Sequence, residues 1–234
     1  MKKALYLLIA LTLMCACASP EKKADRLIRD YMFTHLHDFD SYQKVETSVD
    51  TLYNLPIFND ECIDQAEQII ARNRIIEITE RDAKHNSDIM NIWSDSYTQS
   101  GFKRYKEAYV EWARNKKTIA LAEIIKLENY KKLAALALAL DGCTQTGWIV
   151  THSYRSKTLG GNTSLNTMVF FTDKNFKEIT KAYDEENTPD FDAIGDTILT
   201  SISFTADGTE QVDSLINQWK GVVEKYDQTI QKYE

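Results

Sequence analysis

A seven-residue repeat of apolar positions runs through the middle of the chain, from Asp60 to Gly142. The repeated positions are Cys62, Ile69, Ile76, Ala83, Met90 and Tyr97 in its first half, and Tyr105, Trp112, Ile119, Lys126, Leu133 and Leu140 in its second. Lys126 is the single polar member of this set. A sustained repeat of this kind keeps one helix face against a partner helix. The pattern therefore predicts an antiparallel helical hairpin over residues 60–142, with its turn at Gln99–Gly101.

The second arm of this hairpin, Phe102–Leu140, has two irregular stretches. The polar run Arg114–Thr118 interrupts the apolar face, and we expect the helix to bend or break there. Residues 133–140 contain only Leu and Ala, so this end of the helix is apolar on every side. A helix that is apolar all round is buried on more than one face. We therefore expect this end of the hairpin to lie beneath a sheet.

The rest of the chain predicts a small sheet and three more helices. Helical spacing of apolar residues covers Ala24–Phe39, and residues 41–55 form an irregular segment with one short strand at most. After Gly147 the apolar residues recur at every second position, as in a strand. Two segments rich in strand-forming residues, 148–155 and 164–172, flank the turn Leu159–Asn162. Two helices follow, over residues 189–204 and 207–234. The fold class is α+β and helix-dominated: a long antiparallel helical hairpin, a small antiparallel β-sheet and C-terminal helices.

The N-terminus has the pattern of a secretory signal. Two lysines precede the short apolar run Ala4–Met14, which is too short to span a bilayer. The following segment, with Ala16 before Cys17, resembles the lipobox of bacterial lipoproteins, in which the cysteine is acylated and becomes the new N-terminus. Cys15 fits this pattern less well because it follows Met14. The alternative is an ordinary cleaved signal in which both cysteines are incidental.

This interpretation divides the chain into a signal peptide (1–16), a lipidated tether (17–23) and one α+β domain (24–234), with the β-hairpin and C-terminal helices in 147–234. Acyl chains such as palmitate on Cys17 supply the membrane affinity. The residue after Cys17 is Ala18, not Asp, which by resemblance to sorted lipoproteins indicates the outer membrane. The predicted location is therefore the cell envelope, either periplasmic or surface-exposed.

Three stretches of the mature chain are similar to a group of small bacterial envelope lipoproteins of unknown function. These stretches are Arg29–Phe39, Val45–Asp50 and the Gly-Gly hairpin with residues 169–176. The resemblance implies the same location for this protein. It supplies no activity and no catalytic residues.

Overall charge excludes one class of partner. The chain of 234 residues has a formal net charge of −7 and no stripe of Lys and Arg. Neutralisation of phosphates supplies most of the affinity of nucleic-acid-binding proteins, so we expect no nucleic-acid partner.

Two cysteines lie beyond the predicted anchor, and the envelope is an oxidising compartment. Counting outward from a contact between Tyr97 and Tyr105 places Cys62 opposite Leu140, so Cys143 lies within about one helical turn of Cys62. We predict a disulfide between Cys62 and Cys143, which would close a loop of about 80 residues and contribute roughly 3–4 kcal/mol. Two buried thiols are the alternative.

Five aromatic residues gather near the tip of the hairpin. They are Trp93, Tyr97, Tyr105, Tyr109 and Trp112. Rings at helical spacing are more often core residues than a platform for glycans, although an exposed subset would form a binding patch.

No metal, cofactor or catalytic site is predicted. His35 and His37 would point about 200° apart on a helix, so they cannot share a metal ion. No nucleophile elbow, phosphate-binding glycine loop or Cys-x-x-Cys motif occurs. We therefore expect a non-enzymatic, lipid-anchored protein that binds another protein or a surface polymer as a scaffold. The alternative is a lipoprotein that binds a small ligand or glycan in a pocket between the sheet and the helix end at Leu133–Leu140.

Overall fold

The computed structural model describes residues 19–184, 186–206 and 208–233. These residues form two compact units. The sheet unit contains the described residues up to Asn54 together with Gly142–Pro189, and the helical unit contains Leu55–Asp141 and the described residues from Asp190 onward. The chain thus passes from the sheet unit to the helical unit and back. We expected one domain over residues 24–234, and within this range the structure describes these two compact units.

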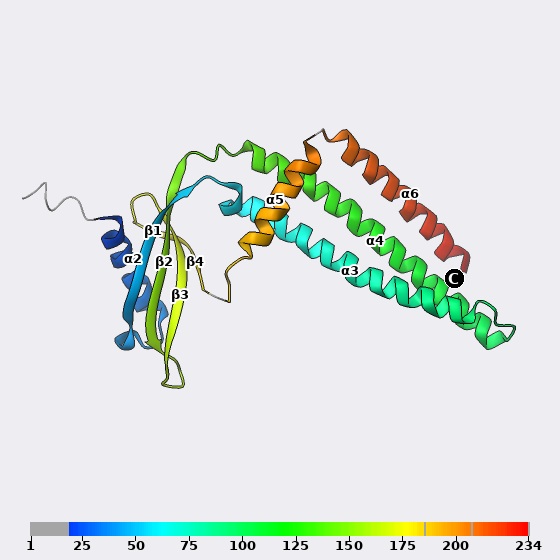
Figure 1. Ribbon diagram of the computed structural model, residues 1–234, viewed down its shortest axis with the longest axis horizontal. Helices are drawn as coiled ribbons and strands as arrows, with labels where there is room; N and C mark the ends of the chain where they lie inside the picture. Colours follow the sequence, from blue (N-terminus) through cyan, green and yellow to red (C-terminus); the bar gives the residue numbers. More distant parts are fainter. Residues whose placement is uncertain (1–18, 185, 207, 234) are drawn as a thin grey trace, which may run out of the picture. The chain divides into compact units, whose positions relative to one another are not determined.

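The sheet unit consists of one antiparallel sheet with a helix on one face (Figure 1). Its elements are α2 (Pro20–His35), β1 (Gln43–Tyr53), β2 (Gln145–Lys157), β3 (Thr163–Asp173) and β4 (Ile179–Tyr183). The strands lie in the order β1-β2-β3-β4, and each pair of neighbours is antiparallel. Together with the helical unit this confirms the α+β, helix-dominated fold class.

Local turn chemistry explains the β2–β3 hairpin. Gly161 has φ +80°, a left-handed conformation that glycine adopts without a steric penalty. The amide of Thr158 donates to the carbonyl of Asn162 at 2.8 Å, and Lys157 pairs with Thr163 where β2 ends and β3 begins. The predicted turn at residues 159–162 is confirmed.

The first strand is a correction. We expected an irregular segment over residues 41–55, but β1 is an 11-residue strand that pairs with β2 from Gln43–Arg155 to Tyr53–Gln145. Its partner is about 100 residues away in sequence. Because β1 is an edge strand with mostly exposed side chains, its alternation of polar and apolar residues is weak.

Helix α2 packs on the sheet through residues spaced four apart. Ala24, Ile28 and Met32 are buried against Val150 and Phe170. The helix begins at Pro20, whose fixed φ suits the first helical position. Residues 20–23, which we expected in the tether, therefore form the first turn of α2. The helix ends at His35, four residues before the predicted end at Phe39.

The helical unit contains the predicted hairpin and both C-terminal helices. Its helices are α3 (Asp60–Trp93), α4 (Gln99–Ala139), α5 (Phe191–Thr205) and α6 (Glu210–Tyr233). Helix α3 begins with the Asn59 side chain accepting from the Cys62 amide at 3.1 Å, and α4 begins with Thr98 accepting from the Gly101 amide at 3.1 Å. A Cβ atom at Gly101 would lie only 1.8 Å from Ser96 Oγ, so glycine permits the tight turn.

The apolar repeat forms the contact between α3 and α4 over most of their length. Ile69 packs in one cluster with Leu133, and Ile76 packs in another with Ile119. The ammonium of Lys126 binds a Glu123 carboxylate oxygen at 2.8 Å, and both side chains are more than four-fifths buried. This ion pair accommodates the one polar member of the repeat.

Helix α4 does not break at Arg114–Thr118, as we had expected. It continues as one helix of 41 residues. The reason is α6, which runs antiparallel beside α4: Lys117 pairs with Asp227 at 2.5 Å and Lys131 with Asp213 at 2.6 Å. Lys117 of the polar run therefore pairs with a second helix, while Arg114 pairs with Glu111 within α4.

The Leu/Ala end of α4 is covered by helices. Leu133 and Ala137 are buried with Cys62 and Ile63 of α3 and with Ile194 of α5. Within the helical unit, helices α3 and α5 supply this burial. The opposite side of the same helix end is exposed, as the 69% exposure of the Leu138 side chain shows. Within residues 19–184, 186–206 and 208–233, no helix combines the length and apolarity that a membrane crossing requires.

Candidate functional site

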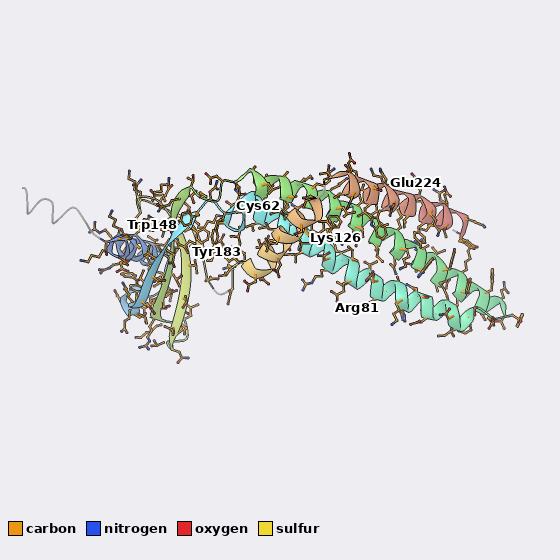
Figure 2. The ribbon with its side chains drawn as sticks, turned by 45° about the horizontal axis from the view of Figure 1, so that its top comes forward. Cys62, Arg81, Lys126, Trp148, Tyr183 and Glu224 are labelled. Carbon is orange, nitrogen blue, oxygen red and sulfur yellow. The ribbon has the colours of Figure 1, made fainter. Side chains whose placement is uncertain are left out.

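The predicted lipidation site, Cys17, lies outside the described residues. The predicted disulfide between Cys62 and Cys143 is not formed. Cys62 lies in the first turn of α3 (Figure 2), where its side chain is fully buried in the helical core. Cys143, by contrast, is exposed in the segment that follows α4. Burial also raises the pKa of the Cys62 thiol, an effect that the charge of Glu61 reinforces.

The five aromatic residues of the hairpin do not form one patch. Tyr105, Tyr109 and Trp112 stack in succession along α4, with ring centroids 6.3 and 5.9 Å apart. Tyr233 and Tyr226 of α6 meet this row edge-on, at 5.1 Å from Tyr109 and 5.5 Å from Trp112. Tyr109 and Trp112 are therefore packing residues between α4 and α6, and Tyr105 extends their row along α4.

The remaining two aromatic residues have different surroundings. The guanidinium of Arg104 lies over the ring of Trp93 at 4.9 Å, at the edge of a cavity between α3 and α4. Tyr97 is fully exposed in the connection between these helices. Of the predicted patch, only Tyr97 is a freely accessible ring.

The two histidines of the rejected metal pair lie on either side of the end of α2. His35 is the last helical residue, and its ring stacks on Tyr31 at 3.8 Å. Among residues 19–184, 186–206 and 208–233, no group of three or more His, Cys, Asp or Glu side chains is arranged to hold a metal ion.

The sheet unit contains a cavity of about 500 Å³. It lies between α2 and the start of β1. Its lining consists of two acidic, two basic and two aromatic side chains: Asp25, Arg29, Phe39, Asp40, Tyr42 and Lys44.

One wall of this cavity is held by a chain of hydrogen bonds that leads into the core. Tyr42 Oη lies 2.8 Å from His152 Nε2, and Nδ1 of the same imidazole lies 2.9 Å from Thr47 Oγ1. The Thr47 hydroxyl donates to Asp25 Oδ1 at 2.8 Å, and Lys44 Nζ lies 2.5 Å from Asp25 Oδ2. Five side chains from α2, β1, β2 and the segment between α2 and β1 thus form one connected network.

The direction of each hydrogen bond follows from the number of protons available. A carboxylate only accepts, so Thr47 donates its single proton to Asp25. The Thr47 oxygen must then accept from His152, which places the imidazole proton on Nδ1. Nε2 is left as an acceptor, and Tyr42 donates its phenolic proton to it. The outward lone pairs of the Tyr42 oxygen remain to accept a hydrogen bond from the cavity.

The pKa shifts agree with this assignment. Burial lowers the pKa of His152, and the charge of Asp25 only partly opposes that effect, so the imidazole is neutral. Burial alone would raise the pKa of Asp25, but the hydrogen bonds from Lys44 and Thr47 outweigh it and lower the value. Burial, assisted by the charge of Asp25, raises the pKa of Tyr42, so the phenol keeps its proton.

A row of stacked rings supports the same wall. Phe39 stacks on Tyr42 with centroids 5.4 Å apart, Tyr42 on His152 at 6.0 Å, and His152 on Tyr154 at 5.8 Å. The rings fix the plane of the imidazole, and its two hydrogen bonds fix its rotation within that plane. The polar wall of the cavity is therefore preorganised.

Sequence reasoning missed this site. Thr47 and His152 are direct partners in the β1–β2 register, although about 100 residues separate them. The signal that could have found them is the presence of both residues on the α2-facing side of their strands, where Val49 and Val150 also lie. A polar pair among apolar neighbours on a buried face needs internal hydrogen-bond partners.

Comparison with known proteins assigns no family to this chain: no family model, curated protein or solved structure matches it.

Proposed function

We propose that this protein is a lipid-anchored component of the cell envelope that binds a small, hydroxyl-rich ligand in the cavity between α2 and β1. The single observation that carries the proposal is the preorganised wall formed by Tyr42, His152, Thr47 and Asp25. A concave site with convergent polar groups is the usual form of a small-molecule site. This location differs from the pocket between the sheet and the end of α4 that we expected from the sequence.

The chemistry of the lining favours a sugar-like ligand. The Tyr42 oxygen and the carboxylate of Asp40 accept hydrogen bonds, while Arg29 and Lys44 donate them. Phe39 adds an apolar ring at the same cavity. A sugar offers hydroxyl groups that both donate and accept, together with C–H faces that pack on aromatic rings. A purely anionic ligand would leave the acceptor side of the cavity unused.

Binding without catalysis agrees with the surroundings of the titratable groups. His152 is 0% exposed and so cannot touch a ligand. The raised pKa of Tyr42 keeps its phenol protonated, which makes it a poor general base. The network therefore holds a binding wall and supplies no activated nucleophile.

Ligand binding can be tested with the chain from residue 18 onward, which contains every described element. Ligand-observed NMR against neutral, acidic and N-acetylated monosaccharides is expected to identify binders. Asp40→Asn and Tyr42→Phe should weaken binding by roughly tenfold each, since each removes one hydrogen bond. The matched control Tyr226→Phe, on α6, should leave binding unchanged. Absence of binding by every sugar, or equal binding by Tyr42→Phe and the wild type, would refute a sugar site here.

The anchor is tested separately. Metabolic labelling with an alkyne analogue of palmitate should tag the full-length protein expressed in a bacterium, and Cys17→Ala should abolish the tag. Cys15→Ala is the matched control and should retain it. A tag that survives Cys17→Ala would contradict acylation at this cysteine.

Binding of another protein or a surface polymer by the helical hairpin is the second candidate function. It is favoured by exposed apolar side chains near the hairpin tip: Ile92 (71% exposed), Phe102 (64%) and the fully exposed Tyr97. Exposed apolar groups of this kind mark interaction surfaces when they are contiguous. Cross-linking in intact envelopes from a photoreactive residue at position 97 should capture a discrete partner if this function holds, and the same residue at position 84 is the control.

A further inference from the structure

Helix α2 presents a row of basic side chains on its exposed side, and the last of them, Arg29, also borders the cavity between α2 and β1. Lys22, Arg26 and Arg29 are all exposed, and Phe33 continues the row with 68% of its surface exposed. Their spacings of four, three and four residues place them on one face of the helix. The opposite face carries Ala24, Ile28 and Met32, which are buried against the sheet. We call the exposed row the basic stripe; our expectation that the chain has no stripe of Lys and Arg is wrong for this helix.

The acidic residues of α2 lie off this stripe. Asp25 faces β1 and is bound by Lys44 and Thr47. Glu21 lies in the first turn of the helix, and at 100° per residue Asp30 lies on the flank of the stripe beside Lys23. A chain with a formal net charge of −7 therefore presents a cationic line on its first described helix.

We propose that the basic stripe docks on the headgroups of anionic phospholipids, so that α2 lies along the membrane surface. Charge complementarity is the first argument, since clustered Lys and Arg residues near a membrane bind anionic lipid. The second is position, and it rests on the proposed anchor: Cys17 precedes Pro20 by three residues, which span at most about 10 Å. Lys22 and Arg26 follow within the next 10 Å or so along the helix, a distance comparable to the Debye length.

Phe33 lies at the far end of the same stripe. Its ring meets Phe39 edge-on at 5.3 Å, so it is held in place although it is exposed. An aromatic ring beside basic residues is a common combination on surfaces that lie at the membrane interface. Docking along the whole stripe would bring this ring to the headgroup region.

The test uses the chain from residue 18 onward, so its outcome does not depend on acylation. Sedimentation with vesicles of phosphatidylglycerol and phosphatidylcholine should show binding that weakens as salt is raised from 20 to 300 mM. Each basic residue near such a surface contributes about fivefold, so Lys22→Gln with Arg26→Gln should lower the partition coefficient roughly 30-fold. Both variants leave Arg29, which also lines the ligand cavity, unchanged.

A matched control removes the same charge elsewhere. Arg74 and Lys84 are exposed on α3, and Arg74→Gln with Lys84→Gln should leave vesicle binding unchanged. Equal loss in the two double variants, equal binding to pure phosphatidylcholine, or no binding at low salt would each overturn the proposal. Palmitate labelling at Cys17 reports on the anchor alone, so failure of the anchor and failure of the docking surface are distinguishable.

Discussion

Replacing Thr47 by Val tests whether the hydrogen-bond chain stabilises the sheet unit. Valine has nearly the shape of threonine but lacks the hydroxyl, so His152 Nδ1–H loses its acceptor and Asp25 loses a donor. His152 is 0% exposed, so water cannot replace the missing acceptor. The side chain of Asp25 is 32% exposed, and water can replace the missing donor there in part.

The expected loss follows from these two exposures. An unsatisfied buried donor costs about 1–3 kcal/mol, and a partly compensated bond to a carboxylate adds roughly 1 kcal/mol. Thr47→Val should therefore destabilise the sheet unit by roughly 2–4 kcal/mol. Thr47→Ser keeps the hydroxyl and removes one methyl group, so its cost should stay near 1 kcal/mol.

Amide hydrogen exchange with mass spectrometry is the assay, because peptides from β2 and β3 report opening of the sheet unit separately from the helical unit. The predicted loss corresponds to exchange that is about 30-fold to 1000-fold faster in these peptides. Thr51→Val is the matched control: Thr51 lies on the same strand and the same face, opposite Trp148. Equal acceleration by Thr47→Val and Thr51→Val would refute a stabilising role for the chain.

Three further predictions concern other parts of the molecule. Because folding lowers the pKa of His152, this residue takes up a proton more readily in the unfolded chain, so the sheet unit should lose stability as the pH falls below about 6.5. Folding also lowers the pKa of Asp25, so a second loss of stability should follow below about 3.8 as this carboxylate is protonated. Hydrogen exchange of β2 across this pH range measures both steps. Tyr109→Ala removes contacts with three rings and should destabilise the helical unit by roughly 3–5 kcal/mol, whereas Tyr109→Phe should cost less than about 1 kcal/mol; urea denaturation compares them. Intact mass should not change on reduction, and a thiol reagent should modify the exposed Cys143 well before the buried Cys62; a mass increase of two protons on reduction would restore the disulfide.

The sequence by itself determined the elements that depend on residues close together along the chain. The apolar repeat from Cys62 to Leu140 follows the helical period, so α3, α4 and their antiparallel contact could be predicted, and the turn at Gly161 could be predicted from its glycines. The predicted position of the turn between α3 and α4 was less accurate. It lies at residues 94–98, before the predicted Gln99, because the Thr98 side chain caps α4 and so makes Gln99 helical.

Long-range contacts decided the remaining features. From the sequence, the polar run Arg114–Thr118 predicts a helix break, but in the structure Asp227 of α6 pairs with Lys117 of this run. The sequence likewise predicts an irregular segment at β1, which becomes a strand because it pairs with β2. The candidate site is the clearest case, since Asp25, Thr47 and His152 come from three elements and have no shared motif. The repeat of apolar positions within one helix can be recognised from neighbouring residues. The register between distant strands, by contrast, depends on which of their faces are buried together. That choice minimises the free energy of the whole chain, so only the tertiary structure places these three side chains in one network.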